Sequence, residues 1–190
     1  MKTNLILLLS IMTIILSSCG VTNDKSASVS QLQDANMKTV ALNVVEDIVF
    51  QGNQNYEIIL GKSKDAPTIC GNFKTKLDGK KLIITTDENN ASSIVLINAD
   101  ILPNIISNGS GNLKFTGRTK RATIYSNGSG DVNAEKFKVN ILTFYSNGSG
   151  DSKVYASSQA NVFLDGSGNV VVKGSPKLVN RMGNFAYNIK

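Results

Sequence analysis

Ser107-Asn108-Gly109-Ser110-Gly111 is repeated along this chain of 190 residues, at Ser126–Gly130 and again at Ser146–Gly150. A fourth copy, Gly166-Ser167-Gly168, follows Leu164-Asp165 instead of Ser-Asn. The first glycines stand at positions 109, 128, 148 and 166, so the copies are 19, 20 and 18 residues apart. A nearly fixed period of this length in a β-rich sequence indicates a fold of stacked, equivalent turns. The repeated motif consists of Gly109, Ser110, Gly111, Gly128, Ser129, Gly130, Gly148, Ser149, Gly150, Gly166, Ser167 and Gly168.

Apolar and polar positions alternate on both sides of these glycines. Four residues before the first glycine, every copy has an apolar residue, and five residues before it every copy has a polar one. Alternation with a period of two is typical of strands with one buried face. Each repeat therefore predicts two strands joined at a Gly-Ser-Gly corner. The apolar positions after the corner are occupied in three of the four copies, by Leu113, Val132 and Val170.

Two architectures fit such a pattern. Asn-Gly is also a strong signal for a two-residue hairpin, which would give an antiparallel sandwich or barrel. A meander, however, has no reason to repeat one corner at one period, so we favour a right-handed parallel β-helix, a solenoid with turns of about 18–20 residues. Glycine at the corners is expected for two reasons, a positive φ angle or close approach of neighbouring turns. A faint further copy at Gly183–Tyr187 is interpreted as a last, incomplete turn.

The rest of the chain sets limits on size and chemistry. Short β-rich segments such as Thr39–Val45 and Lys81–Thr86 extend the all-β interpretation over residues 38–190, which we predict to be one domain. A hydrophobic content of 41% excludes a wholly disordered chain. The absence of histidine excludes Ser–His and Cys–His nucleophile pairs. The net charge of +6 is spread without a basic run, which argues against nucleic-acid binding.

The first residues are predicted to be a lipoprotein signal peptide, residues 1–18. The apolar run from Leu5 to Leu16 is too short to span a bilayer and suits a secretory signal. Leu16-Ser17-Ser18-Cys19 resembles the bacterial lipobox, which predicts that Cys19 is lipidated and anchors the protein in a membrane. An ordinary signal peptide with a chance cysteine is the alternative. Residues 19–37 are interpreted as a flexible tether, or alternatively as an extra edge strand, and the expected location is the bacterial cell envelope, at the outer membrane.

With Cys19 lipidated, Cys70 is the second and last cysteine. Its apolar, strand-like surroundings predict a buried thiol rather than a reactive one.

The repeated Ser-Asn-Gly-Ser-Gly corners behind a lipobox resemble a known family, the auto-transporter adhesin head or GIN domain, whose lipoprotein members occur in Bacteroidota. The closing Lys173-Gly174-Ser175-Pro176 belongs to the same resemblance. It covers about residues 40–190 and implies an exported right-handed parallel β-helix. It brings no catalytic residues, and the family's adhesin label is itself based on likeness.

Asp131 and Asp151 follow equivalent corners, and Gly-Ser-Gly-Asp is similar to the calcium turns of β-roll repeats. The nine-residue frame of those repeats is missing, and calcium needs six to eight oxygen ligands. We therefore expect no metal and no cofactor. No second column of acidic residues accompanies Asp131 and Asp151. We therefore expect that the protein is not an enzyme. The alternative is a polysaccharide lyase or hydrolase on the same scaffold.

One outward column is apolar. Three residues before the first glycines stand Ile106, Tyr125, Tyr145 and Phe163, next to an inward column. Such a stripe is a candidate binding strip for a glycan or protein ligand, or a surface buried by the N-terminal strands or by a second copy in a homo-oligomer. Structural cover is the favoured interpretation. The sequence thus predicts a lipid-anchored envelope module for binding, adhesion or structure.

Overall fold

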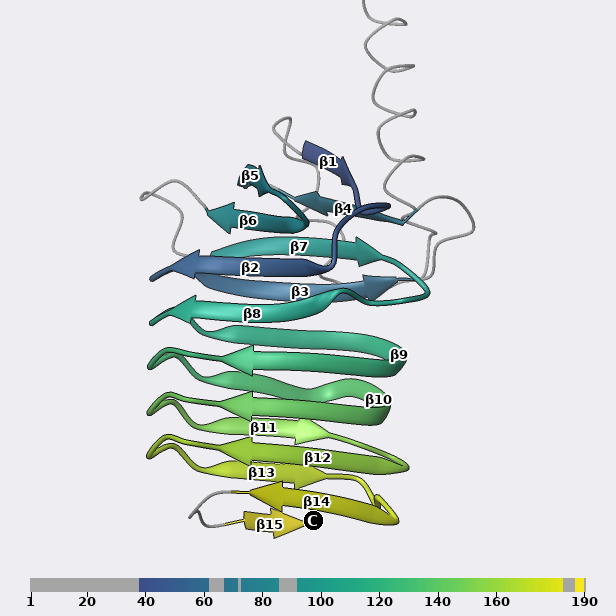
Figure 1. Cartoon of the computed structure of the whole chain (residues 1–190), viewed down its shortest axis with the longest axis vertical. Helices are drawn as coiled ribbons and strands as arrows, with labels where there is room; N and C mark the ends of the chain where they lie inside the picture. The colour runs from purple at the N-terminus through teal and green to yellow at the C-terminus, as the bar shows by residue number, and fades with distance from the viewer. Residues whose placement is uncertain (1–37, 62–66, 72, 86–91, 183–186, 190) are drawn as a thin grey trace, which may run out of the picture.

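The computed structural model describes residues 38–61, 67–71, 73–85, 92–182 and 187–189. Every regular element in these ranges is a strand, which confirms the all-β prediction. Fifteen strands form one curled, mixed sheet (Figure 1). They are β1 Lys38–Ala41, β2 Asp47–Gly52, β3 Asn55–Gly61, β4 Thr68–Gly71, β5 Lys74–Asp78, β6 Lys81–Thr85, β7 Ser92–Asn98, β8 Asn104–Gly109, β9 Leu113–Ser126, β10 Val132–Ser146, β11 Ser152–Tyr155, β12 Gln159–Leu164, β13 Val170–Lys173, β14 Leu178–Met182 and β15 Tyr187–Ile189.

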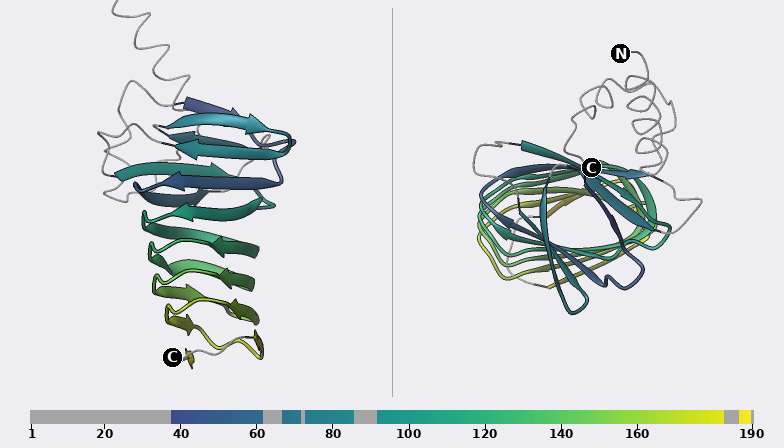
Figure 2. Two further views of the ribbon diagram at one scale, coloured as in Figure 1. Left: turned by 60° about the vertical axis from the view of Figure 1, so that its left-hand side comes forward. Right: turned by 90° about the horizontal axis from the view of Figure 1, so that it is seen from above.

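From β8 onward, equivalent residues of successive repeats are paired in parallel. On one wall, Tyr125 of β9 pairs with Tyr145 of β10, which pairs with Phe163 of β12. On the facing wall, β9, β10, β11, β13 and β15 pair in the same way. The predicted parallel register is confirmed for this part, and the hairpin alternative is wrong there. Figure 2 shows these turns stacked along one axis and, from above, surrounding a common interior.

The interior is filled by the predicted inward columns. Ile105, Ile124, Phe144 and Val162 stack on one wall and are 0% exposed. The opposite wall contributes Leu113, Val132 and Val170, also buried. Ser152 occupies that same column, and its buried hydroxyl has no hydrogen-bond partner. The core thus consists mainly of apolar ladders, and it also contains buried serines such as Ser126, Ser146 and Ser152.

The N-terminal third departs from the uniform parallel stack. The turn of β2 and β3 lies directly on that of β8 and β9, with Ile48 opposite Ile105, although β4 to β7 intervene in the sequence. β6 and β7 pair with the other side of β2 and β3. β5, β4 and β1 then pair antiparallel at the end of the stack (Figure 1). Antiparallel strands here occupy backbone groups that an open parallel edge would expose.

Two register expectations also change. Gly52 pairs with Gly109, so an additional corner precedes the four that the repeat revealed. It was missed because Gly52-Asn53-Gln54 keeps only the first glycine of the motif. At the other end Tyr187 pairs with Val170, not with Val172 as the proposed last copy required, and residues 183–186 of that copy lie outside the described residues.

The corner glycines are required by close approach, not by a positive φ angle. Among the described glycines, only Gly52, Gly79, Gly117 and Gly174 have positive φ. A Cβ added to Gly128 or Gly148 would instead lie 1.7 Å from the backbone oxygen of the equivalent glycine one turn earlier. The positive-φ explanation for the repeated corners is therefore wrong, because neighbouring backbones are simply too close for any side chain.

Candidate functional site

The candidate site is the outward column of Ile106, Tyr125, Tyr145 and Phe163, which we call the aromatic strip. It runs across β8, the second half of β9, β10 and β12 (Figure 1). The Tyr125 and Tyr145 rings stack with centroids 4.6 Å apart and an interplanar angle of 4°. Tyr145 stacks on Phe163 at 4.8 Å and 14°. The three rings lie above one another because their strands pair in parallel at equivalent positions. Each ring covers part of its neighbour, and all three side chains are half-buried.

The strip continues beyond the repeats. Val49 of β2 pairs with Ile106 and is 7% exposed, and Ile83 of β6 pairs with Val49. At the other end Met182 of β14 pairs with Phe163 and is 66% exposed. Sequence reasoning missed Val49 and Ile83 because the strands of this wall do not follow one another as they do in the chain. β2 lies between β6 and β8 in the sheet, although β6 comes between β2 and β8 in the sequence.

Within the described ranges, the N-terminal strands do not lie across the strip. β2, β6 and β5 continue the same wall edge to edge, so they lengthen the sheet instead of covering its outer surface. The interpretation of the strip as a surface buried by the domain's own strands or by a second copy stays a prediction, and the 7% exposure of Val49 shows that one end of the column is covered. Burial raises the pKa of Tyr125, with smaller contributions from Tyr145 and Asp47, so its phenol stays protonated at neutral pH.

Polar columns border the rings on both sides. On the side of the corners, the Asn127 side-chain amide donates to Asn108 at 2.9 Å, and Asn147 donates to Asn127 at 3.2 Å. On the other side, the Asn161 amide donates to the Thr143 hydroxyl at 3.4 Å, and Asn104 continues this polar column next to Ile106. The strip is therefore an apolar platform with amide and hydroxyl groups along both edges.

The two corner aspartates have a structural task. The backbone N–H of Asp151 donates to the Asp131 carboxylate at 2.8 Å, and that of Asn169 donates to the Asp151 carboxylate at 2.9 Å. Asn55 and Asn112 accept the equivalent bonds in earlier turns. These bonds from Asn169 lower the pKa of Asp151, because they favour the charged carboxylate. Each Asn or Asp of the column thus ties its turn to the next.

Neither a metal cluster nor a membrane helix is found in the described part of the chain. No three Cys, Asp or Glu side chains there are grouped so that they could hold a metal ion. Over the same residues, none of the elements is a helix long and apolar enough to cross a membrane.

The two cysteines have different outcomes. Cys70 is buried in β4 as predicted, but its sulfur belongs to a disulfide, so the expected buried thiol is wrong. Cys19, the predicted lipidation site, lies outside the described residues, as do the signal peptide and the tether. The anchor therefore stays a prediction.

Comparison with known families decides the classification. Residues 35–176 match the family described as "Putative auto-transporter adhesin, head GIN domain". The chain belongs to this GIN-domain family. The match spans all four Gly-Ser-Gly corners and the whole aromatic strip up to Phe163, so the resemblance based on those corners is confirmed.

Three solved structures that align with most of the chain are titled as adhesins or as a lipid binding protein. An adhesin structure from Bacteroides fragilis, titled putative, is 17% identical, covering 81% of this GIN-domain chain and 95% of its own, with a TM-score of 0.46. One from Parabacteroides distasonis is 15% identical, covering 81% and 96%, with a TM-score of 0.41. A third, titled a putative lipid binding protein from the same species, is 18% identical, covering 83% and 98%, with a TM-score of 0.38. No curated protein matches the chain.

Proposed function

We propose that this protein is a lipid-anchored module of the bacterial cell envelope that binds glycans along its aromatic strip. The observation that carries the proposal is the row of three stacked rings, Tyr125, Tyr145 and Phe163, bordered by amide and hydroxyl columns. Sugars present C–H groups on a ring face and hydroxyls around the ring edge. An aromatic platform with hydrogen-bonding edges matches both properties.

The spacing of the strip supports a polymeric ligand. Neighbouring strands are about 4.8 Å apart, which is close to the length of one pyranose unit. A glycan chain lying along the stack would therefore meet an equivalent ring and equivalent amides at successive units. The family's adhesin description agrees with such a surface.

The proposed scaffold is a right-handed parallel β-helix. Support comes from the parallel register of β8 to β15 and from the close contact of successive corners, such as Gly148 with Gly128. An elongated stack presents its ligand groups in one straight column, which suits binding to a polymer. A crystal structure would test the hand and the number of turns.

The proposed anchor is a lipid on Cys19, placed in the outer membrane. It is supported by the lipobox pattern Leu16–Cys19 and by the adhesin description. A thioether at Cys19 and a disulfide joining the chain's two cysteines exclude each other, because both need the same sulfur. The intact mass of the membrane-extracted protein distinguishes them. Cys19→Ala should move the protein out of the membrane fraction or leave an uncleaved precursor; normal processing and normal membrane fractionation of the variant would contradict the anchor.

A binding role is favoured over an enzymatic one. The one pair of carboxylates that sequence reasoning considered, Asp131 and Asp151, accepts backbone hydrogen bonds from the next turns. Groups committed to the scaffold in this way are poorly placed to donate or abstract a proton. No specific observation favours the alternative of a polysaccharide lyase or hydrolase.

The test is a glycan array probed with the full-length protein in detergent micelles. Tyr125→Ser combined with Tyr145→Ser should abolish binding of any glycan that the wild type retains. The matched control is Ile59→Ser combined with Val171→Ser, which removes half-buried apolar side chains from the opposite wall and should leave binding unchanged.

Sedimentation of the same samples separates glycan binding from self-association. Should the wild type bind no glycan but form an oligomer that the double Tyr variant dissociates, the strip would be a contact between copies of this chain and the glycan proposal would be wrong. Equal loss of binding in the strip variant and the control would also contradict it.

A further inference from the structure

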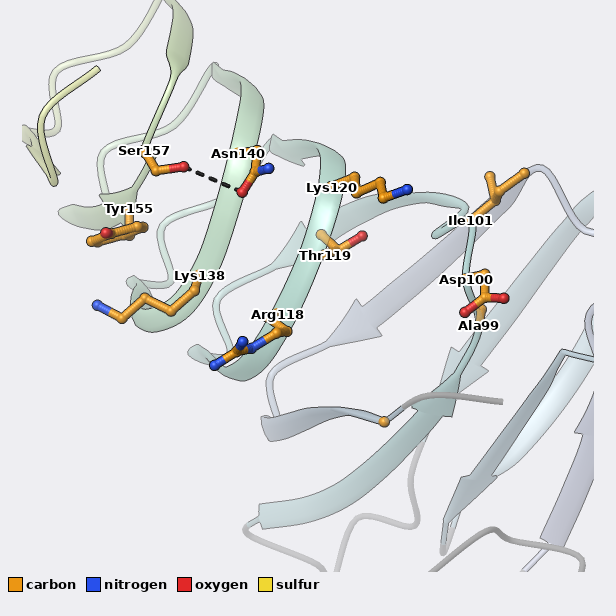
Figure 3. Close-up of a pocket in the computed structure, with 11 residues that line it drawn as sticks. Ala99, Asp100, Ile101, Arg118, Thr119, Lys120, Lys138, Asn140, Tyr155 and Ser157 are labelled. Carbon is orange, nitrogen blue, oxygen red and sulfur yellow. Dashed lines mark hydrogen bonds between the residues drawn. The ribbon is translucent and has the colours of Figure 1, made fainter. Parts of the chain in front are cut away.

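A second candidate site lies on another face of the stack, away from the strip. An open groove of about 790 Å³ is lined by residues of three successive turns (Figure 3). β9 contributes Arg118 and Lys120, and β10 contributes Lys138. Tyr155 at the end of β11 and the segment between β7 and β8 complete it. Arg118 and Lys120 both lie within the long strand β9.

Positive charge is concentrated in this groove by the register. Arg118 pairs directly with Lys138, and strands in register place such side chains on the same face about 4.8 Å apart at the backbone. Lys120 lies two residues after Arg118 on the same strand, and Figure 3 shows its side chain directed toward Ile101. None of these three cations forms a salt bridge with a described acidic side chain, and Asp100 is the one acidic residue in the lining.

The position of the Lys138 ammonium is well defined. It lies 3.7 Å from the centre of the Tyr155 ring, and it donates a long hydrogen bond of 3.5 Å to the backbone oxygen of Glu135. The ring and the carbonyl thus fix the position of this ammonium, on the residue whose backbone pairs with that of Arg118. Two like charges at directly opposite positions of a sheet repel each other. An anion that binds between them removes this repulsion and therefore stabilises the folded chain.

Neutral hydrogen-bonding groups complete the lining. The Ser157 hydroxyl donates to the Asn140 side-chain oxygen at 3.2 Å, which leaves the Asn140 amide N–H groups available as donors. The Thr119 hydroxyl donates to the Arg121 carbonyl at 3.2 Å, which leaves its oxygen available as an acceptor. Amide and hydroxyl groups thus accompany the cations in the lining of the groove.

We propose that this groove binds the carboxylate groups of an acidic polysaccharide. A guanidinium presents a planar fork that fits a carboxylate, and the fixed ammonium supplies a second positive charge beside it. The open shape extends over successive turns and suits a chain rather than an enclosed small molecule, while Asn140, Ser157 and Thr119 match sugar hydroxyls. The inference concerns a site separate from the aromatic strip, so either proposal can fail without the other.

The experiment measures binding of the full-length protein in detergent to polygalacturonate, with its neutral methyl ester as the matched ligand. We expect binding of the acid polymer, at least tenfold weaker binding of the ester, and loss of affinity as salt screens the charges. Arg118→Gln combined with Lys138→Gln should weaken binding of the acid polymer at least tenfold. Lys76→Gln combined with Lys153→Gln removes the same charge from exposed strand positions elsewhere and should change affinity less than twofold.

Three results would overturn the inference. Equal weakening by both double variants would mean that net charge alone attracts the polymer. Equal binding of the ester would mean that carboxylates are not recognised. The third result is strong binding of inorganic phosphate or of phosphatidylglycerol vesicles that is lost in the Arg118/Lys138 variant. If the acid polymer also binds no more tightly than its ester, the groove is a site for phosphate groups.

Discussion

Substitution of Gly148 by alanine tests the physical reason for the repeated corners. The added Cβ would lie 1.7 Å from the backbone oxygen of Gly128, whereas real Cβ atoms essentially never approach closer than 3.0 Å. Two neighbouring turns would have to separate by more than an ångström at a point where the Asn147 N–H donates to the Ser126 oxygen at 2.9 Å. A displacement of that size breaks the adjacent ladder bonds.

The expected cost combines two effects. Two or three lost hydrogen bonds cost about 1 kcal/mol each, and overpacking adds about 1–3 kcal/mol. We therefore expect Gly148→Ala to lower the free energy of unfolding by roughly 3–6 kcal/mol. For a domain of this size, 1 kcal/mol corresponds to about 2–4 °C, so the melting temperature should fall by roughly 6–24 °C.

The assay is thermal unfolding of the full-length protein followed by circular dichroism, with Gly79→Ala as the control. Gly79 has a φ of +60°, and an added Cβ there meets nothing within 4 Å, so alanine adds only backbone strain of about 1–2 kcal/mol. Close approach predicts the larger loss at Gly148. A melting temperature of Gly148→Ala within 1 °C of the wild type, or a larger drop for Gly79→Ala, would refute the reasoning.

Two further substitutions test polar groups of the scaffold. Ser152→Ala should raise the free energy of unfolding by about 1 kcal/mol, because the buried Ser152 hydroxyl lacks a partner; a denaturant titration that shows destabilisation would contradict this. The lowered pKa of Asp151 means that its contribution to stability is present above the unfolded pKa of about 3.9 and is lost as the pH falls through the lower folded value. Asp151→Asn should therefore reduce the fall in melting temperature between pH 5 and pH 2, and an unchanged fall would show that Asp151 does not contribute to it.

The sequence by itself determined the repeating part of the fold. Identical corners at one period dictate that equivalent residues stack, because only a parallel register brings each Asn, Gly and Ser next to its own copy. Alternation around those corners then assigns each side chain to the interior or the exterior, which is why Phe144 is buried and Tyr145 lies on the outside. The column of Tyr125, Tyr145 and Phe163 could therefore be predicted as a line of stacked rings.

The tertiary structure alone decided what lies between and beyond the repeats. Counted from the corner glycines, Arg118 is equivalent to Phe137. An irregularity between Asn133 and Lys136 shifts the strand pairing by one residue. As a result Arg118 pairs with Lys138, and Phe137 is buried. A shift of one residue exchanges the two faces of a strand, and a sequence alignment does not show where the extra residue is accommodated. The insertion of β4 to β7 and the capping of the stack likewise depend on long-range pairing. Local sequence has no information about those partners, because loop entropy and the unsatisfied sheet edge select them only when the whole domain folds.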